Sequence, residues 1–450
     1  MTLKQPLFLD YPIFAADSDS SGYVLTVGGG GGREYGIENQ LDLLRVGPSA
    51  RRRPSVERCF SLPTDTGIFT TVRFSQARRV WVCSVRTFCA FLYVDTDAGG
   101  VMNLGEFATD ERTRKEQEMA TLDPQSRALA TVHEDGTLRL WEVEWLDKQP
   151  RDQRPSSSAA SSSSKPPETL AAALKKKPPT APFEIKRLHL RHTCRGHESG
   201  ALDCDFAHDS SLVATTSRDN TFRLWDTQTG EQIAQEACPA PAKAPAGAKS
   251  LMPRFCRFFP DVGGPASRKY VLVGAHGARG PTTLTIWRVS GSRVEMVGGQ
   301  YLADKVPCCS INISADGRSV ALGLTDGGVR LINTPFPTGS GWSLQYSYMP
   351  HGLPTKAVCF AQRGLLVSAG ADYSLMHQVA DSTRKRPCAG RGCRAYVFWV
   401  LLLMMVAVVV ALVVNVGLLP DSDSHVSDSS RAAESSVHTA APDQTVRDEL

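Results

Sequence analysis

The chain has 450 residues, which is long enough for one large domain or two domains of medium size. Its 50 Lys and Arg residues nearly balance its 46 Asp and Glu residues, and the net charge of +4 gives no reason to expect a nucleic-acid partner. The first residues lack the long apolar core and the cleavage site of a secretory signal peptide. Ten of the twelve cysteines precede residue 381 and none forms a Cys-x-x-Cys pair, which indicates reduced cytosolic thiols rather than a disulfide framework.

A repeated pattern of short alternating strands and tight turns runs from residue 13 to residue 380. Its clearest copy begins with Gly196-His197 and ends with Trp225-Asp226, the signature of a WD repeat. The copies lie at 23–46, 69–94, 122–143, 196–227, 255–289, 311–334 and 358–379. The pattern predicts an all-β fold, a seven-bladed WD-repeat β-propeller over residues 1–380, with residues 6–14 adding the outer strand of the last blade. An open solenoid of repeats is the alternative.

Four residues of the clearest copy look like a catalytic set, but we interpret them as structural. His197, Ser217, Asp219 and Trp225 occupy the positions that form a buried hydrogen-bonded chain in WD repeats. A satisfied polar network of this kind holds a turn against its strand.

Residues 148–182 are rich in Ser, Pro and Lys and poor in side chains that could pack. This composition predicts a disordered insertion in the propeller. We expect it at the connection between the third and fourth blades, where an added loop costs little.

Residues 28–39, with the sequence GGGGGREYGIEN, form an oversized connection between two strands of the first blade. A phosphate-binding loop of the Walker type needs Gly-Lys followed by Ser or Thr, whereas Gly32-Arg33-Glu34 stands here. A dinucleotide-binding fold needs a helix after the glycines, and the strand pattern after residue 40 does not allow one. We therefore expect no nucleotide binding by this chain itself.

Residues 396–419 are uncharged and almost entirely apolar, which predicts a transmembrane helix. Such a helix is about 36 Å long, compared with roughly 30 Å for the hydrocarbon core of a bilayer. A buried helix is the alternative, but at this length it would normally show a polar face. The basic segment 381–395 precedes the span and the acidic segment 420–450 follows it, so the propeller is expected in the cytosol and the tail in the lumen.

The chain ends in Arg447-Asp448-Glu449-Leu450. This sequence resembles the KDEL and HDEL signals that a lumenal receptor reads in the early secretory pathway. The expected localisation is therefore the endoplasmic reticulum membrane, with a single span.

Together with these features, Gly28–Gly32 followed by Gly36-Ile37-Glu38-Asn39 and alternating apolar residues resembles the Sec-twelve/prolactin-regulatory-element-binding protein family. The resemblance implies a guanine-nucleotide exchange factor for a Sar-type small GTPase, which starts COPII vesicle coat assembly and transport from the endoplasmic reticulum to the Golgi. It implies that Asn39 is the main exchange residue and Ile37 a supporting contact, and that Gly36 and Glu38 also meet the GTPase.

The same resemblance implies a potassium ion held by backbone carbonyl groups of the loop, from Gly29, Gly30, Gly31 and Gly32. The implied partners are the GTPase, the endoplasmic reticulum membrane, coat components and a retrieval receptor. The chain would then not be an enzyme in the covalent sense. A membrane-tethered WD-repeat scaffold without exchange activity stays open as the alternative. A hydrolase has no nucleophile elbow, metal-ligand spacing or paired carboxylates to support it.

Overall fold

The structure is a computed structural model that describes residues 6–30, 36–48, 54–64, 67–95, 100–110, 116–148, 181–241, 250–261, 268–277, 280–336, 341–362 and 364–379. These residues belong to one compact unit, Met1–Ser382. Every regular element within them is a β-strand, as predicted. None of these residues forms a helix long and apolar enough to cross a membrane. The predicted span at 396–419, its basic and acidic flanks and the terminal Arg447–Leu450 sequence lie outside the described residues.

The strands form seven four-stranded antiparallel groups, which we number as blades in chain order. Blade 1 contains β2 (Ile13–Ser18), β3 (Tyr23–Gly28), β4 (Gln40–Pro48) and β5 (Pro54–Pro63); blade 2 contains β6 (Thr71–Ser75), β7 (Val80–Val85), β8 (Phe88–Asp95) and β9 (Gly100–Ala108); blade 3 contains β10 (Gln117–Leu122), β11 (Ala128–His133), β12 (Leu138–Asp147) and β13 (Phe183–Cys194). Blade 4 contains β14 (Ala201–Phe206), β15 (Leu212–Ser217), β16 (Thr221–Asp226) and β17 (Gln232–Pro239).

Blade 5 contains β18 (Ser250–Phe258), β19 (Arg268–His276), β20 (Thr282–Ser290) and β21 (Arg293–Asp304); blade 6 contains β22 (Cys308–Ile313), β23 (Ser319–Leu324), β24 (Val329–Asn333) and β25 (Ser343–Tyr348); blade 7 contains β26 (Thr355–Gln362), β27 (Leu365–Gly370), β28 (Ser374–Val379) and the N-terminal β1 (Leu7–Phe8). One short pairing between β17 and β18, of Cys238 with Leu251 and Pro239 with Ser250, joins blades 4 and 5 into one sheet.

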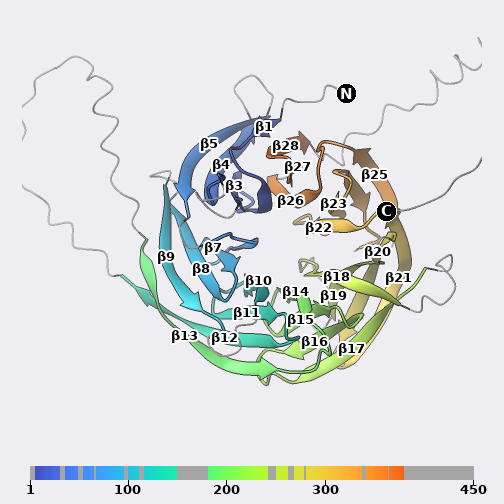
Figure 1. Ribbon diagram of the computed structural model, residues 1–450. Coiled ribbons are helices and arrows are strands. Elements are labelled where there is room, and N and C mark those ends of the chain that lie inside the picture. The colour runs from blue at the N-terminus through green and yellow to red at the C-terminus, as the bar shows by residue number, and fades with distance from the viewer. Residues whose placement is uncertain are drawn as a thin grey trace, which may run out of the picture. The chain divides into compact units, whose positions relative to one another are not determined.

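The blades close into a ring, which is the architecture of a β-propeller (Figure 1). The innermost strand of each blade contacts the innermost strand of the next, and β26 of blade 7 contacts β2 of blade 1. The ring is closed by the first strand of the chain, because Leu7 and Phe8 pair with Leu375 and Ser374. The prediction that residues 6–14 add the outer strand of the last blade is therefore confirmed for Leu7 and Phe8 only, since Ile13 and Phe14 belong to the innermost strand of blade 1. The closed ring excludes the open solenoid. Closure leaves few exposed sheet edges.

The hydrophobic core is divided into clusters that lie between neighbouring blades. Both faces of each sheet are therefore covered, and the second strands β7, β15, β23 and β27 are buried along their whole length. Trp81 and Trp225 are the largest fully buried side chains. This explains why the repeats read as apolar runs between turns.

The predicted insertion lies inside a blade rather than between two blades. Its flanking strands β12 and β13 pair with each other as far as Asp147 and Phe183, and the Lys148 amide donates to the Pro182 carbonyl at 2.8 Å. Both strands belong to blade 3. Residues 149–180 lie outside the described residues, so the insertion starts and ends side by side at one edge of that blade.

None of the ten cysteines in the described ranges forms a disulfide. All but Cys59 and Cys309 are buried.

Candidate functional site

The glycine-rich segment connects the second and third strands of blade 1. The pairing of β3 with β4 runs to Gly28 and Gln40, so the connection extends from Gly29 to Asn39. Residues 31–35, which include Gly31 and Gly32, lie outside the described residues. We refer to residues 29–39 as the glycine loop.

The two limbs of the glycine loop approach each other so closely that side chains would not fit between them. A Cβ atom on Gly29 would lie 2.4 Å from the Asn39 Oδ1 atom, and a Cβ atom on Gly30 would lie 2.6 Å from the Ile37 Cβ atom. Gly29 also has a φ of +146°, a backbone conformation that other residues rarely adopt. Glycine is therefore required at both positions for the loop to close in this way.

Two neighbouring segments hold the base of the loop. The Gly29 amide donates to the Pro12 carbonyl at 3.3 Å, and the Thr64 amide donates to the Asn39 carbonyl at 2.8 Å. Tyr11, which precedes Pro12, is fully buried, and its hydroxyl hydrogen-bonds to the Thr26 hydroxyl at 2.8 Å. The link from β1 to β2 and the end of β5 thus fix the loop to the rigid blade.

The predicted exchange residues fall into two groups within the loop. Asn39 is only 6% exposed and lies at the base, against Gly29. Ile37 is half-buried and packs against the core cluster between blades 7 and 1. Gly36 and Glu38 are exposed, and Gly36 has no heavy atom within 4 Å of the position of a Cβ atom. Among the described residues of the loop, Gly30, Gly36 and Glu38 are therefore accessible, while Asn39 is buried and Ile37 half-buried.

Of the four glycines that the resemblance assigns to a potassium ion, the structure describes Gly29 and Gly30. Because Gly29 and Gly30 have no side chains, backbone atoms alone face the opposite limb. Rings of carbonyl oxygens are the ligands that potassium accepts in proteins. Elsewhere in the described ranges, no group of three His, Cys, Asp or Glu side chains is placed to hold a metal ion.

The hydrogen-bonded chain predicted in the clearest repeat is present in blade 4. The Trp225 Nε1 atom donates to the Thr215 hydroxyl at 2.8 Å, and this hydroxyl hydrogen-bonds to the His197 Nε2 atom at 2.8 Å. The His197 Nδ1 atom lies 2.9 Å from the Asp219 Oδ2 atom. Burial would raise the pKa of Asp219, but hydrogen bonds from His197 and Thr221 outweigh it and lower that pKa well below its usual range. The arrangement ties the turn to the strand and leaves no nucleophile exposed.

The prediction that Ser217 belongs to this chain is wrong. Thr215 takes its place, two residues earlier on the same face of β15. The Ser217 hydroxyl instead donates to the Ser199 carbonyl at 2.9 Å and accepts from the Asp219 amide at 3.1 Å. Ser217 ends the strand, so it reaches the turn rather than the space beneath the histidine ring.

Blade 7 contains a second network that the repeat pattern alone did not predict. The His351 ring hydrogen-bonds to the Ser368 hydroxyl at 2.9 Å and to the Ser374 hydroxyl at 2.7 Å, and Asp372 lies 3.3 Å from its Nδ1 atom. Gln378 pairs with Leu366 as Trp225 pairs with Val213, so a glutamine stands at the tryptophan position. The sequence signal for this network is His351-Gly352 followed by Asp372. The separation between His351 and Asp372 is almost the same as that between His197 and Asp219.

The model of the WD domain, G-beta repeat family (WD40) matches residues 188–226. The matched segment runs from within β13 to the end of β16, and so contains the His197, Thr215, Asp219 and Trp225 network. The chain therefore contains a WD40 repeat, and its all-β fold is that of a WD-repeat protein.

Proposed function

We propose that the chain is a guanine-nucleotide exchange factor for a Sar-type small GTPase, and that the glycine loop is the element that acts on the GTPase. The observation that carries the proposal is the closed conformation of this loop. Asn39 and Ile37 lie so close to Gly29 and Gly30 that a Cβ atom on either glycine would not fit. The WD40 repeat and the propeller fold support a role in protein interaction more generally. The sequence resemblance supplies the identity of the partner.

Exchange requires no covalent chemistry from the chain, so we propose that it is not an enzyme in that sense. An exchange factor stabilises the nucleotide-free GTPase by displacing the switch segments that hold the phosphates and Mg²⁺. A loop ordered in advance loses less entropy when it docks. The hydrogen bonds to Pro12 and Thr64 provide that order.

Within the loop, we assign two roles. Gly36 and Glu38 are exposed and would contact the GTPase first. Asn39 and Ile37 would act as positioning residues, because Asn39 is buried and Ile37 half-buried in the unbound chain. A potassium ion on the carbonyl groups of Gly29, Gly30 and the residues after them would stiffen the loop further.

The site of action in this proposal is the cytosolic face of the endoplasmic reticulum. The apolar stretch 396–419 would anchor the chain, and the Arg447–Leu450 sequence would return it if it left with a vesicle. Loading the GTPase beside the bilayer would start COPII coat assembly where the membrane must bend. Coat components and a retrieval receptor would then be the further partners.

A scaffold that gathers proteins without exchange activity is the second candidate, since WD40 repeats commonly serve protein interaction. The two functions differ in which form of the GTPase they prefer. We would immobilise the full-length chain and measure binding of the GTPase after removal of its nucleotide and after loading with GDP. An exchange factor binds the nucleotide-free form at least about tenfold more tightly, a coupling of roughly 1.4 kcal/mol. Equal binding of both forms would support the scaffold.

A further inference from the structure

The seven innermost strands surround a cavity of about 380 Å³ at the centre of the propeller, which we also call the channel. Residues from all seven blades line it, including Phe14, Thr70, Glu118, Leu202 and Lys356. A volume of this size falls within the range of small-molecule sites. The described residues of the glycine loop do not line this cavity, so a binding site here is independent of the proposed exchange activity.

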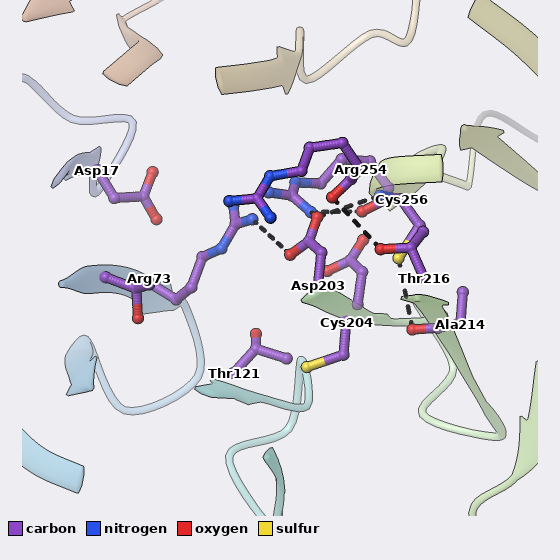
Figure 2. Close-up of polar contacts among 12 residues, drawn as sticks. Asp17, Arg73, Thr121, Asp203, Cys204, Ala214, Thr216, Arg254 and Cys256 are labelled. Carbon is purple, nitrogen blue, oxygen red and sulfur yellow. Dashed lines mark hydrogen bonds and ion pairs between the residues drawn. The ribbon is translucent and has the colours of Figure 1, made fainter. Parts of the chain in front are cut away.

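Buried ion pairs cross the cavity on one side (Figure 2). The Arg73 Nη2 atom on blade 2 lies 3.6 Å from the Asp203 Oδ1 atom on blade 4, and the Arg257 Nη1 atom on blade 5 lies 2.5 Å from Asp203 Oδ2. Asp17 and Asp205 each accept a hydrogen bond from a backbone amide of the following blade, at 2.8 and 2.7 Å. These carboxylates are therefore engaged in joining blades.

A second set of side chains enters the cavity because of a repeated irregularity in the strands. Six of the seven innermost strands shift register by one residue near their start when they pair with the second strand. A bulge of this kind leaves one residue unpaired and redirects its side chain. The six extra residues are Phe14, Glu118, Leu202, Arg254, Cys309 and Lys356, and every one of them lines the cavity.

The charges of this set are unevenly distributed. Arg254 of blade 5 and Lys356 of blade 7 flank Cys309 of blade 6, and neither cation forms an ion pair with any described residue. Glu118, on the far side, is already paired with Arg218 at 2.7 Å. Burial raises the pKa of the Cys309 thiol, and the positive charges of Lys356 and Arg254 oppose that rise. Figure 2 shows the Arg254 side chain extending from its strand toward the middle of the view.

We propose that Arg254 and Lys356 form a binding site for the phosphate group of a small soluble molecule inside the channel. A guanidinium and an ammonium group supply charge-assisted donors that phosphate oxygens prefer, and Asn312 adds an amide to the same wall. Neither cation has a carboxylate of the described residues within ion-pair distance, although the charge of Arg254 also acts on the buried Asp203, whose carboxylate is engaged by Arg73 and Arg257. Strands of all seven blades enclose the site, which favours a small molecule over a folded partner.

The test is calorimetric titration of the full-length chain with inorganic pyrophosphate. The variants are Arg254→Gln and Lys356→Met, and the matched control is Arg293→Gln, which removes an exposed cation on β21. We expect binding by the wild type, a roughly ten- to hundredfold loss of affinity in each channel variant, and no change in the control. No binding by the wild type, or equal binding by all four proteins, would overturn the proposal.

Soluble molecules and lipid headgroups both carry phosphate groups. A second experiment distinguishes these two sources of phosphate. The chain is mixed with phosphatidylcholine vesicles with and without a phosphoinositide. Retention only on the phosphoinositide vesicles, without pyrophosphate binding, would assign the cations to a lipid surface and contradict the proposal.

A chemical readout covers the case in which a channel variant fails to fold. Cys309 and Cys59 are the two described cysteines that are not buried, so the wild-type chain carries its own control. Alkylation in alkaline buffer, quantified by peptide mass spectrometry, should slow at Cys309 and not at Cys59 when pyrophosphate is present. An unchanged rate at Cys309 would show that the phosphate does not occupy the channel.

Discussion

The guanidinium of Arg73 on blade 2 forms an ion pair with the carboxylate of Asp203 on blade 4, with 3.6 Å between Nη2 and Oδ1, and so bridges two blades that are not neighbours. The Asp203 side chain is 1% exposed and also pairs with Arg257 of blade 5. One carboxylate therefore links three blades across the channel. These ion pairs connect blades through the centre of the ring, in addition to the contacts between neighbouring blades.

Replacing Asp203 with Asn should destabilise the propeller strongly. The change leaves Arg73 and Arg257 buried without their shared counter-ion, which typically costs about 3–5 kcal/mol. Asp209→Asn is the control, because Asp209 pairs with Lys269 at the surface with half its side chain exposed, and such pairs contribute about 1 kcal/mol or less. Chemical unfolding of both variants checks the difference. Equal losses would mean that the channel pair contributes no more than a surface pair.

Replacing Asp219 with Asn should reduce stability in a pH-dependent way. The folded-state pKa of Asp219 lies below its unfolded value, because hydrogen bonds from His197 and Thr221 outweigh the effect of burial. The charged carboxylate therefore stabilises the wild type above the unfolded pKa of about 4, and this contribution is lost as the pH falls below it. We expect a difference of about 1–3 kcal/mol near neutral pH that shrinks in acid. Unfolding curves measured across that range provide the check, and a difference that grows in acid would contradict the assignment.

Removing the first strand should open the ring. Deletion of residues 2–9 takes away β1 and the buried Leu9, whose amide donates to the Tyr373 carbonyl at 2.9 Å. Loss of one buried leucine alone costs about 2–5 kcal/mol, and the freed edge of β28 promotes association. A shorter deletion, of residues 2–5, keeps the strand and serves as the control. The unfolding midpoint and light scattering should change only in the longer deletion; if both deletions behave alike, the strand does not close the ring.

Much of the fold could be predicted from the sequence because its signals are local. Gly196-His197 and Trp225-Asp226, with the turn Asp219-Asn220 between them, identify three of the four strands of blade 4, and the turn Asp326-Gly327 marks blade 6. The outer strands were the part not identified. Strand β17, for example, is half exposed and has no long apolar run, so its residues resemble a connection.

The placement of individual side chains inside the propeller could not be predicted from the sequence, and the physical reason differs between them. Thr215 and Ser217 are both hydroxyl residues on one face of β15, and only their depth in the blade decides which one lies beneath His197. Arg254 and Lys356 enter the channel through bulges, which have no mark in the sequence. The glycine loop was recognisable, but the position of Asn39 at its base depends on the close approach of Gly29 and on the Thr64 amide, which donates to the Asn39 carbonyl.

A methyl group on Gly30 should impair exchange without unfolding the propeller. Its Cβ atom would lie 2.6 Å from the Ile37 Cβ atom and would push the two limbs of the glycine loop apart. Gly352→Ala is the matched control, since Gly352 lies outside the left-handed region and the nearest heavy atom to its Cβ position is the Asp372 Oδ2 atom at 3.9 Å. We expect roughly tenfold slower GDP release with Gly30→Ala, and a change of less than about twofold with the control. If both variants keep full activity, the close approach of the limbs has no part in exchange.

The most direct measurement is the rate of fluorescent GDP release from a purified Sar-type GTPase after addition of the full-length chain. We predict that the wild type accelerates release by on the order of tenfold or more, equivalent to about 1.4 kcal/mol of barrier. We also predict that Asn39→Ala loses most of this acceleration, while Asn103→Ala, on the exposed outer strand β9, retains it. No acceleration by the folded wild-type chain, or equal acceleration by wild type and Asn39→Ala, would contradict the assignment of the glycine loop to exchange.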